Sequence, residues 1–118
     1  MRNSFFTTLF GAAICLSLSG CRGTMPPKPL EMLTPQEQLG RAAFAANCGS
    51  CHYDRVGGSL HGPSLLGVYK KSYLPSGAPA NDDRIRNVIQ HGRGNMPPLG
   101  SSVNDETIED ILVYLKTL

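Results

Sequence analysis

The sequence of 118 residues contains no tryptophan and only four phenylalanines and four tyrosines. A chain this short, with few large aromatic side chains, usually needs a disulfide, a metal or a bound cofactor to stabilise its core. It also lacks a charge excess, because 11 Lys and Arg stand against 9 Asp and Glu, so we expect no nucleic acid partner. The length fits one domain and excludes a repeat array or a transmembrane bundle.

Long hydrophobic runs are also absent. The apolar run over residues 5–18 has fourteen residues, too few for a stable membrane-spanning helix but typical of a secretory signal. Residues 18–21, Leu-Ser-Gly-Cys, resemble the lipobox of bacterial lipoproteins, a family in which the signal is cut before the cysteine and the cysteine carries lipid. We predict a lipoprotein signal peptide over residues 1–20, export from the cytoplasm, and lipid on Cys21. Two alternatives stay open: a short membrane anchor or buried core helix over the apolar run, and export with cleavage nearby but without lipid.

Residues 22–33 contain three prolines and show neither a helical nor a strand period. We therefore expect residues 21–33 to form the lipidated Cys and a semi-rigid, extended tether. Twelve such residues reach at most about 40 Å. With acyl chains on Cys21, this tether would hold a domain over residues 34–118 at a membrane surface but clear of the lipid.

Residues 34–118 predict an all-α domain of three main helices. Thr-Pro-Gln-Glu at residues 34–37 is a typical helix start, and this helix runs to Cys48. The second helix begins at residues 81–83, Asn-Asp-Asp, and stops at Gly92. The third begins at Ser102 or Asn104 and runs to the C-terminus. Its apolar stripe follows the helical period and comprises Ile108, Ile111, Leu112 and Leu115. The long irregular connections cannot close a core without something in the middle.

Residues 48–52 read Cys-Gly-Ser-Cys-His, the C-x-x-C-H pattern of covalent haem attachment. Two thiols at this spacing can add to the two vinyl groups of one haem. The adjoining imidazole of His52 then lies under the iron as an axial ligand. We predict one haem c bound through Cys48 and Cys51, and the predicted export supports this because c-type haem is attached outside the cytoplasm.

Three other interpretations of this motif stay open. A zinc site would add two further ligands, for which His61 and His91 are available, although zinc sites usually present a second closely spaced pair. A thioredoxin-like redox pair would need a helix that starts at the first cysteine, whereas here a helix ends there. A structural disulfide between Cys48 and Cys51 is the third.

The sixth iron ligand should come from downstream. Met96, in Gly-Asn-Met-Pro-Pro, offers a soft, neutral thioether, and the two prolines fix the backbone that presents it. The alternatives are a methionine packed in the core, or a bis-histidine site that uses His61 or His91. Met25 and Met32 precede the attachment motif and are sterically poor ligands.

With these motifs, residues 34–118 resemble a bacterial class I cytochrome c domain. Gly40 and Phe44 match the glycine and aromatic residue of the N-terminal helix in that family, and Tyr114 matches the aromatic residue of its C-terminal helix. The resemblance implies that the two helices cross at right angles. It also implies that the carbonyl of Pro63, in His-Gly-Pro, accepts a hydrogen bond from Nδ1 of His52 and orients the ring.

Other side chains flank these motifs. Lys70 and Lys71 are either solvated or a docking patch. The remaining candidates are side chains for contact with the porphyrin or its propionates: Tyr69, Tyr73, Arg55 and Arg93.

The resemblance implies a mono-haem electron carrier rather than an enzyme, working between membrane or periplasmic redox proteins, and we expect a monomer. Saturated His/Met ligation leaves no site on the iron for a substrate. Two alternatives stay open: a haem subunit of a dehydrogenase complex, and a ligand-binding sensor or peroxidase with a labile sixth ligand. A metal-binding lipoprotein without haem is a third possibility.

Overall fold

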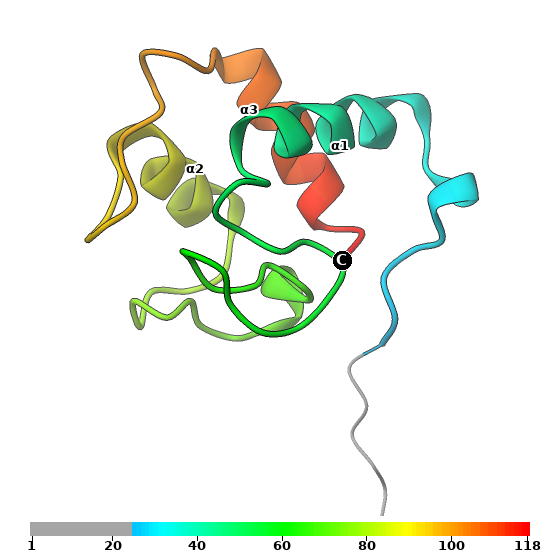
Figure 1. Cartoon of the computed structure of the whole chain (residues 1–118), viewed down its shortest axis with the longest axis horizontal. Helices are drawn as coiled ribbons and strands as arrows, with labels where there is room; N and C mark the ends of the chain where they lie inside the picture. Colours follow the sequence, from blue (N-terminus) through cyan, green and yellow to red (C-terminus); the bar gives the residue numbers. More distant parts are fainter. Residues whose placement is uncertain (1–24) are drawn as a thin grey trace, which may run out of the picture.

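The computed structural model describes residues 25–118, which form three α-helices joined by long loops (Figure 1). The elements are η1 (Leu30–Met32), α1 (Pro35–Asn47), η2 (Val68–Lys70), α2 (Asp82–His91) and α3 (Asp105–Leu115). In this part of the chain, β pairing is limited to isolated bridges, as the prediction of an all-α fold requires. None of its helices is long and apolar enough to span a membrane. The predicted signal peptide and Cys21 lie outside the described residues.

Each helix begins where a side chain satisfies its first free backbone N–H groups. In α1 the Thr34 hydroxyl accepts from the Glu37 backbone N–H at 3.3 Å, and the Glu37 carboxylate accepts from the Thr34 N–H at 2.7 Å. At the start of α2, the Asn81 side chain accepts from the Arg84 backbone N–H at 3.0 Å. Asn104 caps α3, so the third helix starts at the later of the two predicted positions.

The crossing of α1 over α3 is the main contact between helices (Figure 1). Gly40 permits it, because a Cβ at this position would lie 2.6 Å from the Asp110 carbonyl carbon and 2.8 Å from the Tyr114 Cβ. One turn later, the rings of Phe44 and Tyr114 pack with centroids 5.9 Å apart and planes tilted by 58°. The pairing of these residues expected from the resemblance is therefore present.

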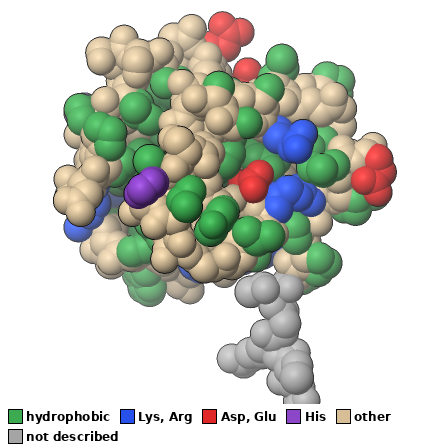
Figure 2. Space-filling model, in the orientation of Figure 1, with side chains coloured by type: hydrophobic (Ala, Val, Ile, Leu, Met, Phe, Trp, Pro, Cys, Tyr) green, Lys and Arg blue, Asp and Glu red, His purple; other side chains and the backbone are tan. Residues whose placement is uncertain are grey.

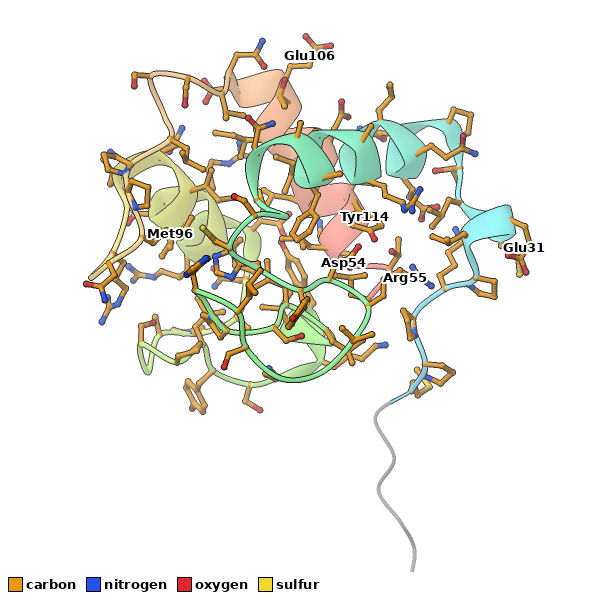
Figure 3. All side chains as sticks on the ribbon, viewed as in Figure 1. Glu31, Asp54, Arg55, Met96, Glu106 and Tyr114 are labelled. Carbon is orange, nitrogen blue, oxygen red and sulfur yellow. The ribbon has the colours of Figure 1, made fainter. Side chains whose placement is uncertain are left out.

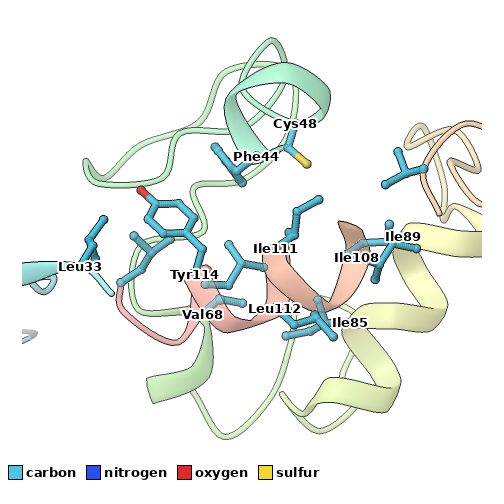
Figure 4. Packing of buried hydrophobic residues seen from close by; sticks show 13 residues of the cluster. Leu33, Phe44, Cys48, Val68, Ile85, Ile89, Ile108, Ile111, Leu112 and Tyr114 are labelled. Carbon is cyan, nitrogen blue, oxygen red and sulfur yellow. The ribbon is translucent and has the colours of Figure 1, made fainter. Parts of the chain in front are cut away.

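The core is centred on α3, which buries one side against α1 and another against α2 (Figure 4). The largest completely buried side chains all belong to this helix or to the residues that follow it: Ile108, Ile111, Leu112, Tyr114, Leu115 and Leu118. The face in Figure 2 carries charges of both signs with no large area of one sign, in keeping with the balanced composition.

The sequence predicts a semi-rigid, extended tether before residue 34, and the structure shows in addition that much of this segment packs on the domain. Residues 25–33, which we call the strap, lie against the domain, and η1 forms within them. The Lys28 backbone N–H donates to the Thr117 carbonyl at 2.7 Å, and Leu33 is only 6% exposed. The prolines do keep the strap out of α-helix, but packing and hydrogen bonds that sequence periodicity does not reveal fix its course.

Candidate functional site: an apolar cavity with two thiols, an imidazole and a thioether

The C-x-x-C-H motif forms a tight turn that continues directly from α1. The Cys48 backbone N–H donates to the Phe44 carbonyl at 2.8 Å as the last bond of the helix. The backbone N–H groups of Cys51 and His52 then both donate to the Cys48 carbonyl, at 3.0 and 2.9 Å. This turn sets both thiols and the imidazole on one wall of a cavity, and both thiols are free.

The cavity has a volume of about 640 Å³, within the usual range for cofactor sites. It lies among the turn after α1, the loop around residues 61–65, α2, α3 and the loop around Met96. Every predicted haem-site residue lines it, namely Cys48, Cys51, His52, Pro63 and Met96. Most of the remaining wall is apolar and includes Phe44, Leu65, Val68, Ile85, Ile111 and Leu115.

His52 is held in one orientation by the two residues that follow His61. Its Nδ1 lies 2.8 Å from the Pro63 carbonyl oxygen. Since a carbonyl only accepts, Nδ1 is the donor in this bond, which leaves Nε2 as the ring nitrogen that would bind a metal. Gly62 lies against the same ring, where a Cβ would approach Nδ1 to 2.7 Å. The role of Gly62 was not predicted, although its place beside Pro63 was a usable signal.

The Met96 loop is built on two glycines with positive φ. Gly92 ends α2 at φ 73°, and Gly94 has φ 57°. Arg93 lies between these two glycines, and its backbone exchanges two hydrogen bonds of 3.0 Å with the backbone of Met96. The loop then returns to α2, where the Leu99 N–H donates to the Ile89 carbonyl at 2.9 Å. Met96 is therefore presented by a closed turn (Figure 3).

The electrostatics of the cavity are those of an apolar pocket with a basic mouth. Burial raises the pKa of the Cys48 thiol to about 11, and the neighbouring Cys51 adds to this. No described lining residue is acidic, whereas His61, Lys71 and Arg93 line the cavity with exposed side chains. A bound group with anionic substituents would find its counter-charges here.

Of the side chains that flank the motifs in the sequence, some line the cavity and others lie elsewhere. Arg93 and Lys71 line the cavity, but Arg55 does not: its guanidinium donates to the Lys28 carbonyl at 2.7 Å. Lys70 and both tyrosines, Tyr69 and Tyr73, are also absent from the cavity wall. Tyr69 donates to Asp82 at 2.8 Å and lies under Lys116, while Tyr73 is 64% exposed.

The alternatives for the cysteines fit these surroundings poorly. In residues 25–118 no group of three or more His, Cys, Asp or Glu side chains is placed to hold a metal ion, and His91 instead faces the Asn87 carbonyl. A reactive redox pair needs a lowered thiol pKa, but the pKa of Cys48 is raised. The cavity suits a haem c better, because the two thiols, the imidazole and the thioether line it together with mostly apolar side chains.

The Asp54–Arg55–Tyr114 cluster was not predicted. The Tyr114 hydroxyl donates to Asp54 at 2.7 Å, which ties α3 to the loop two residues beyond His52 (Figure 3). Burial, and then this bond to Asp54, raise the pKa of Tyr114. Arg55 Nη1 is buried without a hydrogen-bond partner. Only the aromatic character of Tyr114 was visible in the sequence; the pairing joins residues 60 positions apart.

Comparison with known proteins supports the class that the fold and the cavity define, a class I c-type cytochrome. The family model described as "Cytochrome C oxidase, cbb3-type, subunit III" matches residues 35–115, and the chain belongs to this family.

Relatives with known names belong to the same class of c-type cytochromes. Cytochrome c6 of Pyropia tenera is 32% identical over 76 residues, which cover 64% of this chain and 85% of the relative. Cytochrome c6 of Gloeothece citriformis is 30% identical over 79 residues, which cover 64% and 66%. A cytochrome c-553-like protein of Synechocystis sp. is 36% identical over 80 residues, or 67% and 66%. The match therefore spans about two thirds of two of these relatives. The predictions of an all-α cytochrome c fold, one haem c and mono-haem electron transfer are confirmed.

Proposed function

We propose that the chain carries single electrons between redox proteins, with one haem c joined to Cys48 and Cys51 and ligated by His52 and Met96. This assignment rests on the way in which distant segments of the chain come together at one cavity. Side chains from three separate segments, the turn after α1, the loop at Pro63 and the loop at Met96, line one apolar cavity. Bound there, haem c supplies an iron that alternates between Fe(III) and Fe(II).

The residues of the cavity suit outer-sphere electron transfer rather than catalysis. Pro63 fixes the ring of His52 through the 2.8 Å bond to Nδ1, and the closed turn between Arg93 and Met96 fixes the thioether. With His52 and Met96 both bound to its iron, a haem would have no open position for a substrate, and its surroundings would change little between redox states. The neutral sulfur of Met96 and the apolar wall both favour the reduced state, which raises the reduction potential.

The partners are redox proteins that meet the mouth of the cavity through a small, transient interface. Lys71 and Arg93 line the cavity with exposed side chains, but the two propionates of a bound haem would offset their charge, so we expect no strong electrostatic steering toward one partner. The family description names a subunit of a terminal oxidase, which supports a respiratory partner or membership of a larger complex. We propose that the protein works as a monomer.

We further propose that the protein is exported and anchored by lipid on Cys21. The support is the Leu-Ser-Gly-Cys sequence at the end of a typical signal, together with the requirement that c-type haem be attached outside the cytoplasm. Mass spectrometry of the mature protein tests this. A chain that begins at Cys21 and carries acyl chains supports it, and a cleaved chain without lipid refutes it.

The ligand assignment is tested with Met96→Ala and the matched control Met32→Ala, since Met32 is 62% exposed on the strap. In the holoprotein, the control should keep a low-spin spectrum that is indifferent to carbon monoxide. Met96→Ala should become high-spin when oxidised and bind carbon monoxide when reduced. If Met96→Ala keeps the wild-type spectrum, Met96 is not the ligand, and the sensor or peroxidase interpretation with a different sixth position gains support.

A further inference from the structure

The strap has a fixed course but leaves most of its large apolar side chains in solvent. Lys28 fixes the middle of the strap through three contacts. Its side-chain ammonium contacts the Glu37 carboxylate at 2.6 Å, its backbone N–H donates to the Thr117 carbonyl, and its own carbonyl accepts from Arg55. At its start, the Met25 carbonyl accepts from Lys70 at 3.1 Å. The strap is thus part of the folded domain.

Three of the four large apolar side chains of the strap point away from that domain. Met25, Leu30 and Met32 are 70%, 41% and 62% exposed, and only Leu33 is buried. Leu39, in the second turn of α1, adds a fourth exposed side chain at 61%. Large apolar side chains that are exposed together on one segment often mark a contact with a protein or a membrane.

Cys21 precedes Met25 by only four residues, which reach at most about 14 Å. If Cys21 carries lipid, as proposed above, the start of the strap at Met25 stays close to the bilayer. The exposed side chains would then lie at the depth where amphipathic segments enter the headgroup region. We infer that the strap, through Met25, Leu30 and Met32, rests on the lipid surface and sets the orientation of the anchored domain.

This orientation leaves the haem cavity open to the aqueous side. Neither the strap nor the side chains that hold it, from Glu37, Arg55 and Lys70, line the cavity. Glu31 on the strap and Met96 at the cavity lie at opposite sides of the molecule (Figure 3). A redox partner therefore reaches the cavity from the aqueous side or along the membrane, and not through the lipid. The Lys28 charge is already paired with Glu37, and the other charged side chain of the strap, Glu31, is exposed and anionic, so attraction of cations to the headgroups does not drive the contact and it should depend little on salt.

The test uses the two strap methionines as natural probes. The lipidated holoprotein is bound to phosphatidylcholine vesicles and footprinted with hydroxyl radicals, next to unlipidated holoprotein of residues 22–118 with the same vesicles. Oxidation of Met25 and Met32 should be at least fivefold slower in the anchored protein. Tyr73, which is 64% exposed next to cavity-lining Leu74, should react equally in both forms.

A matched pair of lipidated variants adds specificity. Met32→Glu should restore oxidation at Met25, and Leu60→Glu, at a 44% exposed residue next to cavity-lining His61, should not. Mass spectrometry separates the two ways to fail. A mature chain without acyl chains overturns the anchoring and this orientation with it. A lipidated chain in which Met25 and Met32 react as fast as in the unlipidated protein overturns only the orientation.

Discussion

Replacing Gly62 by alanine should displace the His52 imidazole. A Cβ on Gly62 would lie 2.7 Å from Nδ1 and 3.0 Å from Nε2 of that ring. Relief of the contact with Nδ1 alone, from 2.7 Å to an ordinary 3.4 Å, requires the ring to recede by about 0.7 Å, and Cε1, which would lie closer still to the Cβ, requires more. Ligand geometry in a functional site tolerates about 0.5 Å. The same shift can stretch the 2.8 Å bond to Pro63 beyond hydrogen-bonding range.

The expected loss in the free energy of unfolding is about 2–4 kcal/mol, from overpacking of about 1–3 kcal/mol and one lost hydrogen bond of about 1 kcal/mol. Guanidinium unfolding of the holoprotein, followed by haem absorbance, measures it. The matched control is Gly57→Ala in the same loop, where a Cβ meets nothing within 4 Å. If Gly62→Ala unfolds at the same denaturant concentration as Gly57→Ala and keeps the wild-type spectrum, the proposed fit between Gly62 and the ring is wrong.

Three further predictions concern the ligand loop, the helix crossing and the strap. Gly92→Ala should loosen Met96 and allow carbon monoxide to bind the reduced haem, because φ is 73° and a Cβ would lie 2.5 Å from the Met96 carbonyl oxygen; optical titration checks this. Gly40→Ala should lower the melting temperature by about 10 °C, since its Cβ would meet backbone of α3 at 2.6 Å, and an unchanged melting temperature contradicts it. The hydrogen bond from Lys28 lowers the pKa of Glu37, so its contribution to stability is present above the ordinary pKa of 4.5 and is lost as pH falls through the lowered value. The free energy of unfolding, measured at pH 7 and pH 3, should therefore change less with pH for Glu37→Gln than for the wild type.

Local signals in the sequence were sufficient for the helices. Capping residues and periodic apolar stripes act within a few positions, so the starts of α1 and α2 and the buried stripe of α3 were all predictable. The haem motif was equally local, because the three groups of residues 48–52 follow one another in a single turn.

Features that depend on distant segments were not predictable. The docking of Lys28 on Thr117 joins the two ends of the described chain, and no periodicity within the strap reveals it. Arg55 was a candidate for the haem propionates, but its guanidinium donates to the Lys28 carbonyl of the strap. This partner lies 27 positions earlier, too far for a local sequence signal to reveal it. The role of Gly62 also needed coordinates, because only the three-dimensional position of the His52 ring shows that a Cβ has no room there.

The central claim, a haem c held between His52 and Met96, is tested most directly by absorption spectra of the matured holoprotein. The oxidised protein should show a low-spin c-type spectrum with the weak sulfur-to-iron charge-transfer band. The dithionite-reduced protein should keep the same spectrum when carbon monoxide is added. A high-spin oxidised spectrum, or a reduced spectrum that changes with carbon monoxide, would contradict firm ligation by Met96 and the assignment as an electron carrier.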